Sequence, residues 1–115
     1  MSDSTTLLAG VPVSDFGAAV EWYDRLFGRP ADISVHESEV MWKVADAGWL
    51  YVVADAARAG HALVTLSVPD LADARTKLIG RGIEVGPIEA VGDAGWKAVA
   101  VDADGNMLSF IQVTN

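Results

Sequence analysis

Few side chains of this sequence could carry out acid–base, nucleophilic or metal chemistry. The chain has two histidines and no cysteine, so disulfides, thiolate ligands and thiol nucleophiles are all excluded. No serine stands in a nucleophile-elbow motif, and neither histidine has an obvious orienting carboxylate in the sequence. The residues therefore give little support for covalent or acid–base catalysis.

The two histidines are the first candidates for metal ligands. His61 follows Gly60 at the start of a predicted strand, where a lone histidine is more typical of a loop or a cavity rim. His36 and Glu39 belong to a polar segment, residues 36–39, that coincides with a predicted strand end and turn. A solvated loop explains this segment, and a role at the mouth of a cavity is the alternative. The sequence therefore predicts no metal site at either histidine.

Residues 102–106 superficially resemble a calcium-binding loop. The segment reads Asp-Ala-Asp-Gly-Asn, but its glycine comes too early, and Val113 stands where the loop-closing glutamate would fall. Apolar segments flank it on both sides, which is typical of a hairpin turn. We therefore interpret residues 102–106 as a turn between two strands.

Aromatic side chains are more informative than the polar ones. The chain has four tryptophans, and the Trp-Lys pair that begins at Trp42 returns at Trp96, 54 positions later. Trp49 and Tyr51 alternate on a predicted strand, so both point to one face of it. Flat rings stack on planar ligands and attract cations through their faces. We therefore predict an aromatic-lined cavity formed by Trp42, Trp49, Tyr51 and Trp96, with a core or dimer-interface role as the alternative.

The chain also repeats one pattern over its whole length. Asp15 and Asp70 each open a helical pattern shortly after a valine, 55 positions apart. A period near half the length predicts two copies of one supersecondary unit. We expect one domain, residues 1–115, made of two β-α-β-β-β repeats at about residues 5–54 and 61–114. A ligand site is expected where the two repeats face each other.

The hydrophobic pattern places the elements within each repeat. Asp15 and Asp70 can cap the two helices because their side chains accept hydrogen bonds from first-turn amides. Gly28 ends the first helix, and Gly80 or Gly82 ends the second. The buried helix stripes are expected at Phe16, Ala19, Val20, Tyr23 and Phe27, and at Leu71, Ala74, Leu78 and Ile79. Strands are expected at residues 6–13, 32–36, 40–44, 49–54, 62–68, 83–84 with an extension toward 88, 96–101 and 107–113.

Composition limits the partners of the chain. The net charge of −8 disfavours nucleic acid and anionic membrane surfaces. No apolar run reaches the roughly 18 residues of a membrane span. The polar, acidic residues 1–6 have neither the basic start nor the apolar stretch of a signal peptide. We therefore expect a cytoplasmic protein with no nucleic-acid or membrane partner.

The ordered set of motifs resembles the vicinal oxygen chelate superfamily, which includes glyoxalase I, extradiol dioxygenases, fosfomycin-resistance enzymes and bleomycin-binding resistance proteins. The shared features are the two helix starts, the Glu-Trp-Tyr and Leu-Phe-Gly segments of the first helix, and Asp-Gly-Asn before the last strand. The resemblance implies an α+β fold in which two tandem β-α-β-β-β modules form a cupped mixed sheet with helices on the outside.

The metal ligands of that superfamily are not retained here. The resemblance places a histidine seven residues before each helix-starting aspartate, at Leu8 and Leu63. It places a carboxylate three residues after the final Gly-Asn, at Ser109, and the matching stretch of the first half, residues 49–53, has no carboxylate. These side chains cannot hold a divalent cation against its hydration shell.

The resemblance and the missing ligands together predict a protein without metal or other cofactor that binds a planar, apolar or cationic small molecule, as in drug or metabolite sequestration. The expected ligand-binding residues are Leu8, Gly10, Trp42, Trp49, Tyr51, Leu63, Thr65, Trp96 and Ser109. Open sheet edges and family precedent predict a homodimer. Two alternatives are a glyoxalase- or dioxygenase-like metalloenzyme with displaced ligands such as His36, Glu39 or His61, and a structural or regulatory module with a filled cavity.

Overall fold

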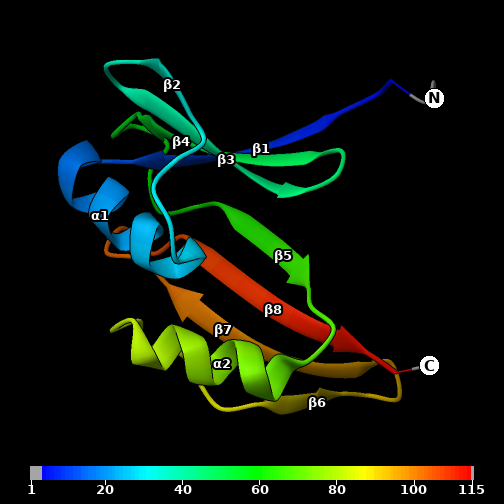
Figure 1. The fold of residues 1–115 in the computed structure, drawn as a ribbon. Helices are drawn as coiled ribbons and strands as arrows, with labels where there is room; N and C mark the ends of the chain where they lie inside the picture. The colour runs from blue at the N-terminus through cyan, green and yellow to red at the C-terminus, as the bar shows by residue number, and fades with distance from the viewer. Residues whose placement is uncertain (1–3, 115) are drawn as a thin grey trace.

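The computed structural model describes residues 4–114 and shows two modules with the same order of elements (Figure 1). Residues 1–3, which belong to the stretch expected to lack a signal peptide, lie outside the described residues. The first module contains β1 (Leu7–Val13), α1 (Phe16–Phe27), β2 (Ile33–His36), β3 (Glu39–Ala45) and β4 (Gly48–Ala54). The second contains β5 (Leu63–Ser67), α2 (Leu71–Gly80), β6 (Glu89–Val91), β7 (Gly95–Val101) and β8 (Met107–Val113).

Each module has its own four-stranded mixed sheet. The strand orders are β1-β4-β3-β2 and β5-β8-β7-β6, and the first and last strands of each module pair in parallel. The remaining neighbours are antiparallel. The α+β fold with two β-α-β-β-β modules is therefore confirmed, with a separate sheet in each module.

Both helices begin at the predicted caps. The Asp15 carboxylate accepts a hydrogen bond from the Ala18 amide, and the Asp70 carboxylate accepts one from the Asp73 amide. Gly28 ends α1 in the left-handed conformation with φ 71°, where a side chain would be strained. No helix within residues 4–114 is long and apolar enough to cross a membrane.

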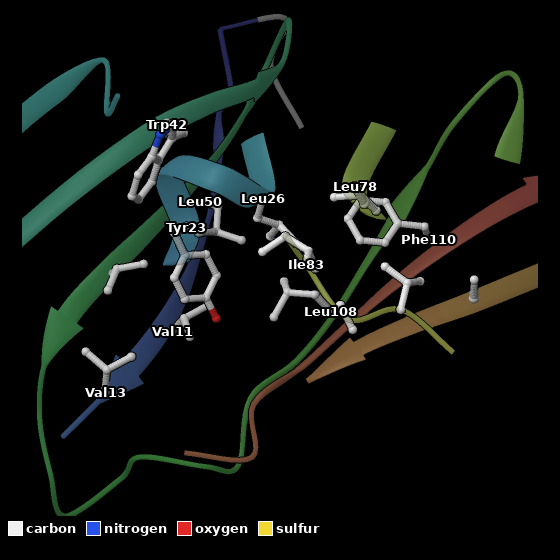
Figure 2. Close-up of a cluster of buried hydrophobic side chains, with 14 of the residues drawn as sticks. Val11, Val13, Tyr23, Leu26, Trp42, Leu50, Leu78, Ile83, Leu108 and Phe110 are labelled. Atoms are coloured by element: carbon white, nitrogen blue, oxygen red, sulfur yellow. The ribbon is translucent and has the colours of Figure 1, made fainter. Parts of the chain in front are cut away.

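The two modules share one apolar core. Side chains from α1, α2 and one face of each sheet form a single buried cluster, in which Leu26 of α1 lies between Tyr23 of the same helix and Leu78 of α2 (Figure 2). Because each sheet turns one face to this cluster, its opposite face points away from the core. We call these the open faces of the first and second modules.

Polar contacts fix the two modules against each other at the turn after β7. The fully buried Asn106 accepts hydrogen bonds from the amides of Gly60 and Ala62 at 3.1 and 3.0 Å, and its own amide donates to the Pro12 carbonyl at 2.8 Å. The Asp104 carboxylate accepts hydrogen bonds from the Ser14 amide and hydroxyl. The predicted turn at residues 102–106 is confirmed, and it links the last strand pair to β1 and to the inter-module segment.

Two predictions of secondary structure and burial were wrong. The strand expected at 83–88 is replaced by a loop with one isolated bridge, Val85 to Ala100, and the edge strand β6 comes later. Arg75 holds this loop through bonds from its guanidinium to the carbonyls of Val85 and Gly86. Ile79 of the expected α2 stripe is 47% exposed, because α2 turns Leu71 and Leu78 to the core instead.

Candidate functional site

The open face of the first module carries four of the predicted ligand-binding residues. Leu8 and Gly10 of β1 stand opposite Trp49 and Tyr51 of β4, in the pairs Leu8–Trp49 and Gly10–Tyr51. A β-carbon added to Gly10 would come within 2.4–2.8 Å of three atoms of the Tyr51 side chain. The phenol ring therefore lies directly over β1, in space that only a glycine leaves free.

The open face of the second module has small or aliphatic side chains at the matching positions. Thr65 of β5 pairs with Ser109 of β8, and Leu63 pairs with Met107. Leu63 is 79% exposed and Met107 is also exposed. Among the described residues, this face offers an apolar patch with three hydroxyl groups, those of Thr65, Ser67 and Ser109, and no ring.

The seven predicted residues on the open faces do not form one cavity within a single chain. Both sheets turn their other faces to the same core cluster, so the two open faces point away from it. A ligand lying on Tyr51 and a ligand lying on Ser109 would therefore contact different sides of the chain.

The donor set does not fit the metal ion that the superfamily resemblance implies. The positions expected for ligands hold Leu8, Leu63 and Ser109, and Tyr51 occupies the place in the first module that Ser109 has in the second. No group of three or more His, Cys, Asp or Glu side chains within residues 4–114 is arranged to hold a metal ion. Two leucines, a hydroxyl and a phenol form no site for a divalent cation.

The histidines of the alternative metal site, His36 and His61, also belong to no group of three or more possible metal ligands among the described residues. His36 Nε2 lies 3.7 Å from Glu39 Oε1, and His36 Nδ1 accepts a hydrogen bond from the Ser38 amide. This local cluster sits on the exposed β2–β3 turn. His61 is exposed in the segment before β5. Neither histidine is brought to an open face with further ligands.

The prediction that Trp42 lines a ligand cavity was wrong. Figure 2 shows Trp42 among the buried side chains of the core, and the residue is 0% exposed. Its ring lies 5.3 Å from that of Phe27 between centroids, and its Nε1 donates to the Arg29 carbonyl at 3.0 Å. Trp42 pairs with Leu50 on the core side of the first sheet. A ring enclosed on all sides cannot present a face to a ligand.

Trp96 does not occupy the place in the second module that Trp42 has in the first. In the first module, Trp42 is opposite Leu50, which pairs with Ala9. In the second module, Ala100 is opposite Leu108, which pairs with Val64. Ala9 and Val64 both stand six residues before their helix-capping aspartates, so Ala100 is the counterpart. Trp96 is 49% exposed, at the far end of β7 and on the opposite side from the open face.

A groove of about 460 Å³ runs between the two modules. Phe27 and Leu50 line it from the first module, and Val64 and Leu66 line it from the edge strand β5. The predicted residues Trp49 and Thr65 stand at its border with the open faces. Arg29 and Lys43 are also among the lining residues of this groove. The sequence analysis missed them because no motif marks two residues that only tertiary packing brings to one groove.

One hydroxyl group in the core and one carboxyl group near the groove have displaced pKa values. Burial, reinforced by the Asp102 carboxylate, raises the pKa of the Tyr23 hydroxyl far above its usual range, and this hydroxyl donates to Asp102 at 2.8 Å. The hydrogen bond from the Lys43 amide, with a second from Arg29, lowers the pKa of the Asp32 carboxyl. Tyr23 therefore remains a neutral donor, and Asp32 an acceptor already occupied by protein groups.

Solved structures of other proteins resemble this chain over nearly its full length. A glyoxalase/bleomycin resistance protein from Catenulispora acidiphila is 36% identical, with a TM-score of 0.89 over 96% of this chain and 99% of that one. An antibiotic-binding protein from a Streptomyces strain is 25% identical, with a TM-score of 0.77 over 99% of both chains. A bleomycin-binding protein complexed with bleomycin shares the fold at 23% identity, with a TM-score of 0.76 over 98% of this chain and 100% of that one. No protein-family model and no curated protein matches the sequence.

Proposed function

Because this chain belongs to the glyoxalase/bleomycin resistance protein family of the vicinal oxygen chelate superfamily, we propose that it binds a small planar molecule and sequesters it without chemical change. The observation that supports this most is the Tyr51 ring lying over Gly10 on the first open face. Together with Trp49, it offers a flat aromatic surface on which a planar ligand can stack.

The charge of the chain favours a neutral or cationic ligand for this face. The net charge is −8, and a site without a metal ion lacks the positive charge that would hold an anion. Aromatic faces attract cations. An antibiotic-binding structural relative and a bleomycin complex of the same fold make an antibiotic with a planar cationic part our preferred ligand class.

We propose that a second copy of the chain completes the site. The two open faces of one chain point away from the shared core, and exposed apolar side chains such as Leu8 and Leu63 lie on them. In a homodimer, the first open face of one copy can lie opposite the second open face of the other. A ligand would then stack on Tyr51 of one copy and contact Ser109 of its partner. Light scattering at micromolar concentration should return the mass of a dimer, and a monomer would contradict this arrangement.

The proposal includes the absence of a resident metal ion, because the expected ligand positions hold Leu8, Leu63 and Ser109. Elemental analysis after purification without a nickel column should find no stoichiometric divalent metal. About one zinc, manganese, nickel or iron per chain, lost in His61→Ala, would instead support the metalloenzyme with displaced ligands.

Tryptophan emission tests the binding function directly, because Trp49 borders the Tyr51 surface. We expect metal-free bleomycin, titrated in the presence of EDTA, to quench or shift the emission and to raise the melting temperature. Tyr51→Ala should weaken binding about tenfold, the factor that roughly 1.4 kcal/mol of lost stacking and burial produces. Trp96→Ala is the matched control and should leave the affinity unchanged. Equal affinities in the unaltered protein, Tyr51→Ala and Trp96→Ala would show that Tyr51 does not contact the ligand.

A further inference from the structure

We propose that Glu39 selects a cationic ligand on the first open face and fixes its direction there, with the positive group of the ligand at the β2–β3 end of the Tyr51 surface. This inference rests on the proposed function, because it places the charge of the molecule that stacks on Tyr51. It narrows the ligand class from neutral or cationic molecules to planar molecules with a positive group at one end of the ring system.

Glu39 lies on the same face of the first sheet as the Tyr51 ring. In the β3–β4 ladder, Met41 is opposite Tyr51, and Glu39 is opposite Val53. Because side chains alternate along a strand, Glu39 and Met41 both point to the open face on which Tyr51 lies. Glu39 is therefore the diagonal neighbour of Tyr51 across the two strands, at a separation of roughly 7–8 Å. A ligand stacked on the ring can reach the carboxylate.

Glu39 is the only acidic residue in the four strands of the first sheet, all of which lie in the described part of the chain. Its side chain is 24% exposed, and its ion-pair partner among the described residues is His36, whose Nε2 lies 3.7 Å from Glu39 Oε1. Histidine side chains are ordinarily neutral at pH 8. At that pH the partly buried carboxylate is available to a cation on the open face.

The opposite end of the aromatic surface carries a positive group. Lys43 is opposite Trp49 in the same ladder and is the only lysine or arginine in the four strands. It stands four residues from Glu39 along β3, roughly 13 Å at the rise of a strand. The Asp32 carboxylate accepts a hydrogen bond from the Lys43 amide at 2.7 Å, but it is paired with Arg29 at 3.0 Å. A cation on this face is therefore attracted to the Glu39 end and repelled from the Lys43 end.

Two dyes with one ring system separate charge recognition from stacking. Thioflavin T is a planar cation, and its uncharged analogue lacks only the ring N-methyl group that carries the charge. Equilibrium dialysis of each dye against the full chain, at pH 8 and about 50 mM salt, measures both affinities. Glu39→Gln should weaken thioflavin T binding about fivefold and leave analogue binding within about twofold, because only the cation loses a partner. The difference should shrink at about 0.5 M salt, where exposed charges are screened.

Glu37→Gln is the matched control for the net charge. Glu37 lies two residues before Glu39 in the exposed β2–β3 turn, and the variant removes the same charge. It should change neither affinity by more than about twofold, and Lys43→Gln should not weaken thioflavin T binding. Equal losses in the two glutamate variants would attribute the effect to net charge alone and overturn the inference. Equal loss of both dyes in Glu39→Gln would overturn it by giving Glu39 a structural role.

Tyr51→Ala separates this inference from the proposed function, because both dyes should lose affinity when the ring is removed. If Tyr51→Ala weakens both dyes and Glu39→Gln weakens neither, the aromatic surface stands and the role of Glu39 is wrong. If neither dye binds the unaltered protein, the aromatic surface and the role of Glu39 are both wrong.

Discussion

The two modules have one backbone plan but differ in where they place large side chains. On the core side, Trp42 of β3 corresponds to Ala100 of β7. On the open side, Tyr51 crosses β1 at Gly10, whereas the corresponding pair in the second module is Ser109 with Thr65. The first module therefore has rings on both sides of its sheet where the second has small residues.

This difference separates two roles that aromatic residues have in the same sheet. Rings on the core side of β3 join α1 to the sheet, as the contacts of Trp42 with Tyr23 and Phe27 show. A ring on the open side is not needed for that packing, because the second module folds with a serine there. The aromatic surface of the first open face is therefore the better candidate for ligand contact, and the predictions below test this separation.

Replacing the core ring should have the largest effect. Trp42→Ala leaves a cavity among Tyr23, Phe27 and Leu50, and we expect a loss of about 3–5 kcal/mol in the free energy of unfolding. Trp96→Ala, at an exposed position, should cost less than about 1 kcal/mol. Urea unfolding followed by circular dichroism measures both. If the Trp42→Ala protein is as stable as the unaltered chain and loses only ligand affinity, the result would show that Trp42 lines the ligand cavity and would contradict its core role.

The turn between β7 and β8 should come next. Asn106→Ala removes the acceptor of the Gly60 and Ala62 amides and the donor to Pro12, which leaves buried polar groups without partners. We expect a loss of about 2–3 kcal/mol. Within residues 4–114, no hydrogen bond joins the matched turn of the first module, between β3 and β4, to the other module. Asp46→Ala should therefore change stability by less than about 0.5 kcal/mol. Similar losses in the two variants would contradict a special role of the second turn.

A smaller effect is expected where the Tyr51 ring lies on β1. Gly10→Ala places a β-carbon where the phenol now lies, so the ring must swing away from the strand. Overpacking of this kind should cost about 1–2 kcal/mol and weaken binding of metal-free bleomycin severalfold. Gly17→Ala in α1, where an added β-carbon meets no atom closer than 4.0 Å, is the control and should not reduce affinity. Unchanged binding in Gly10→Ala would show that the ring position does not matter.

The smallest effect concerns a carboxyl group near the end of α1. Burial, with Glu21 as a second cause, raises the pKa of Asp24, whose Oδ1 is buried without a hydrogen-bond partner among the described residues. Because the pKa is higher in the folded state, this group favours folding at low pH and opposes it once ionised. Asp24→Asn should therefore add about 0.3 kcal/mol at pH 7, and the gain should disappear as the pH falls below about 4. Thermal melts at both pH values test the sign.

The sequence predicted local structure well and three-dimensional placement less well. Asp15, Asp70 and Gly28 act through contacts within a few residues, so their capping roles could be derived from residue type and spacing, and the structure confirms them. The registers of Trp42 and Trp96 depend on how many residues each module has between its helix and its sheet. A repeated Trp-Lys pair does not contain that information, so it cannot show that Trp42 and Trp96 occupy different places in their sheets.

The groove and its cations also lay beyond sequence reasoning. Lys43 and Leu66 are 23 positions apart and belong to different modules, and only the shared core brings them to one groove. By contrast, alternation along each strand was sufficient to place Leu8, Gly10, Trp49 and Tyr51 on one face, which the ladder of β1 and β4 bears out. Alternation could not show that the two open faces of one chain both point away from the shared core and therefore form no common site.

The most direct test of the account compares the two open faces by titration calorimetry with metal-free bleomycin in the presence of EDTA. The account predicts measurable binding to the unaltered protein, about tenfold weaker binding in Tyr51→Ala, and a change of no more than about threefold in Ser109→Ala, because a stacked ring contributes more than one exposed hydroxyl. No heat of binding, or a loss in Ser109→Ala that exceeds the loss in Tyr51→Ala, would contradict the claim that the aromatic face of the first module holds the ligand.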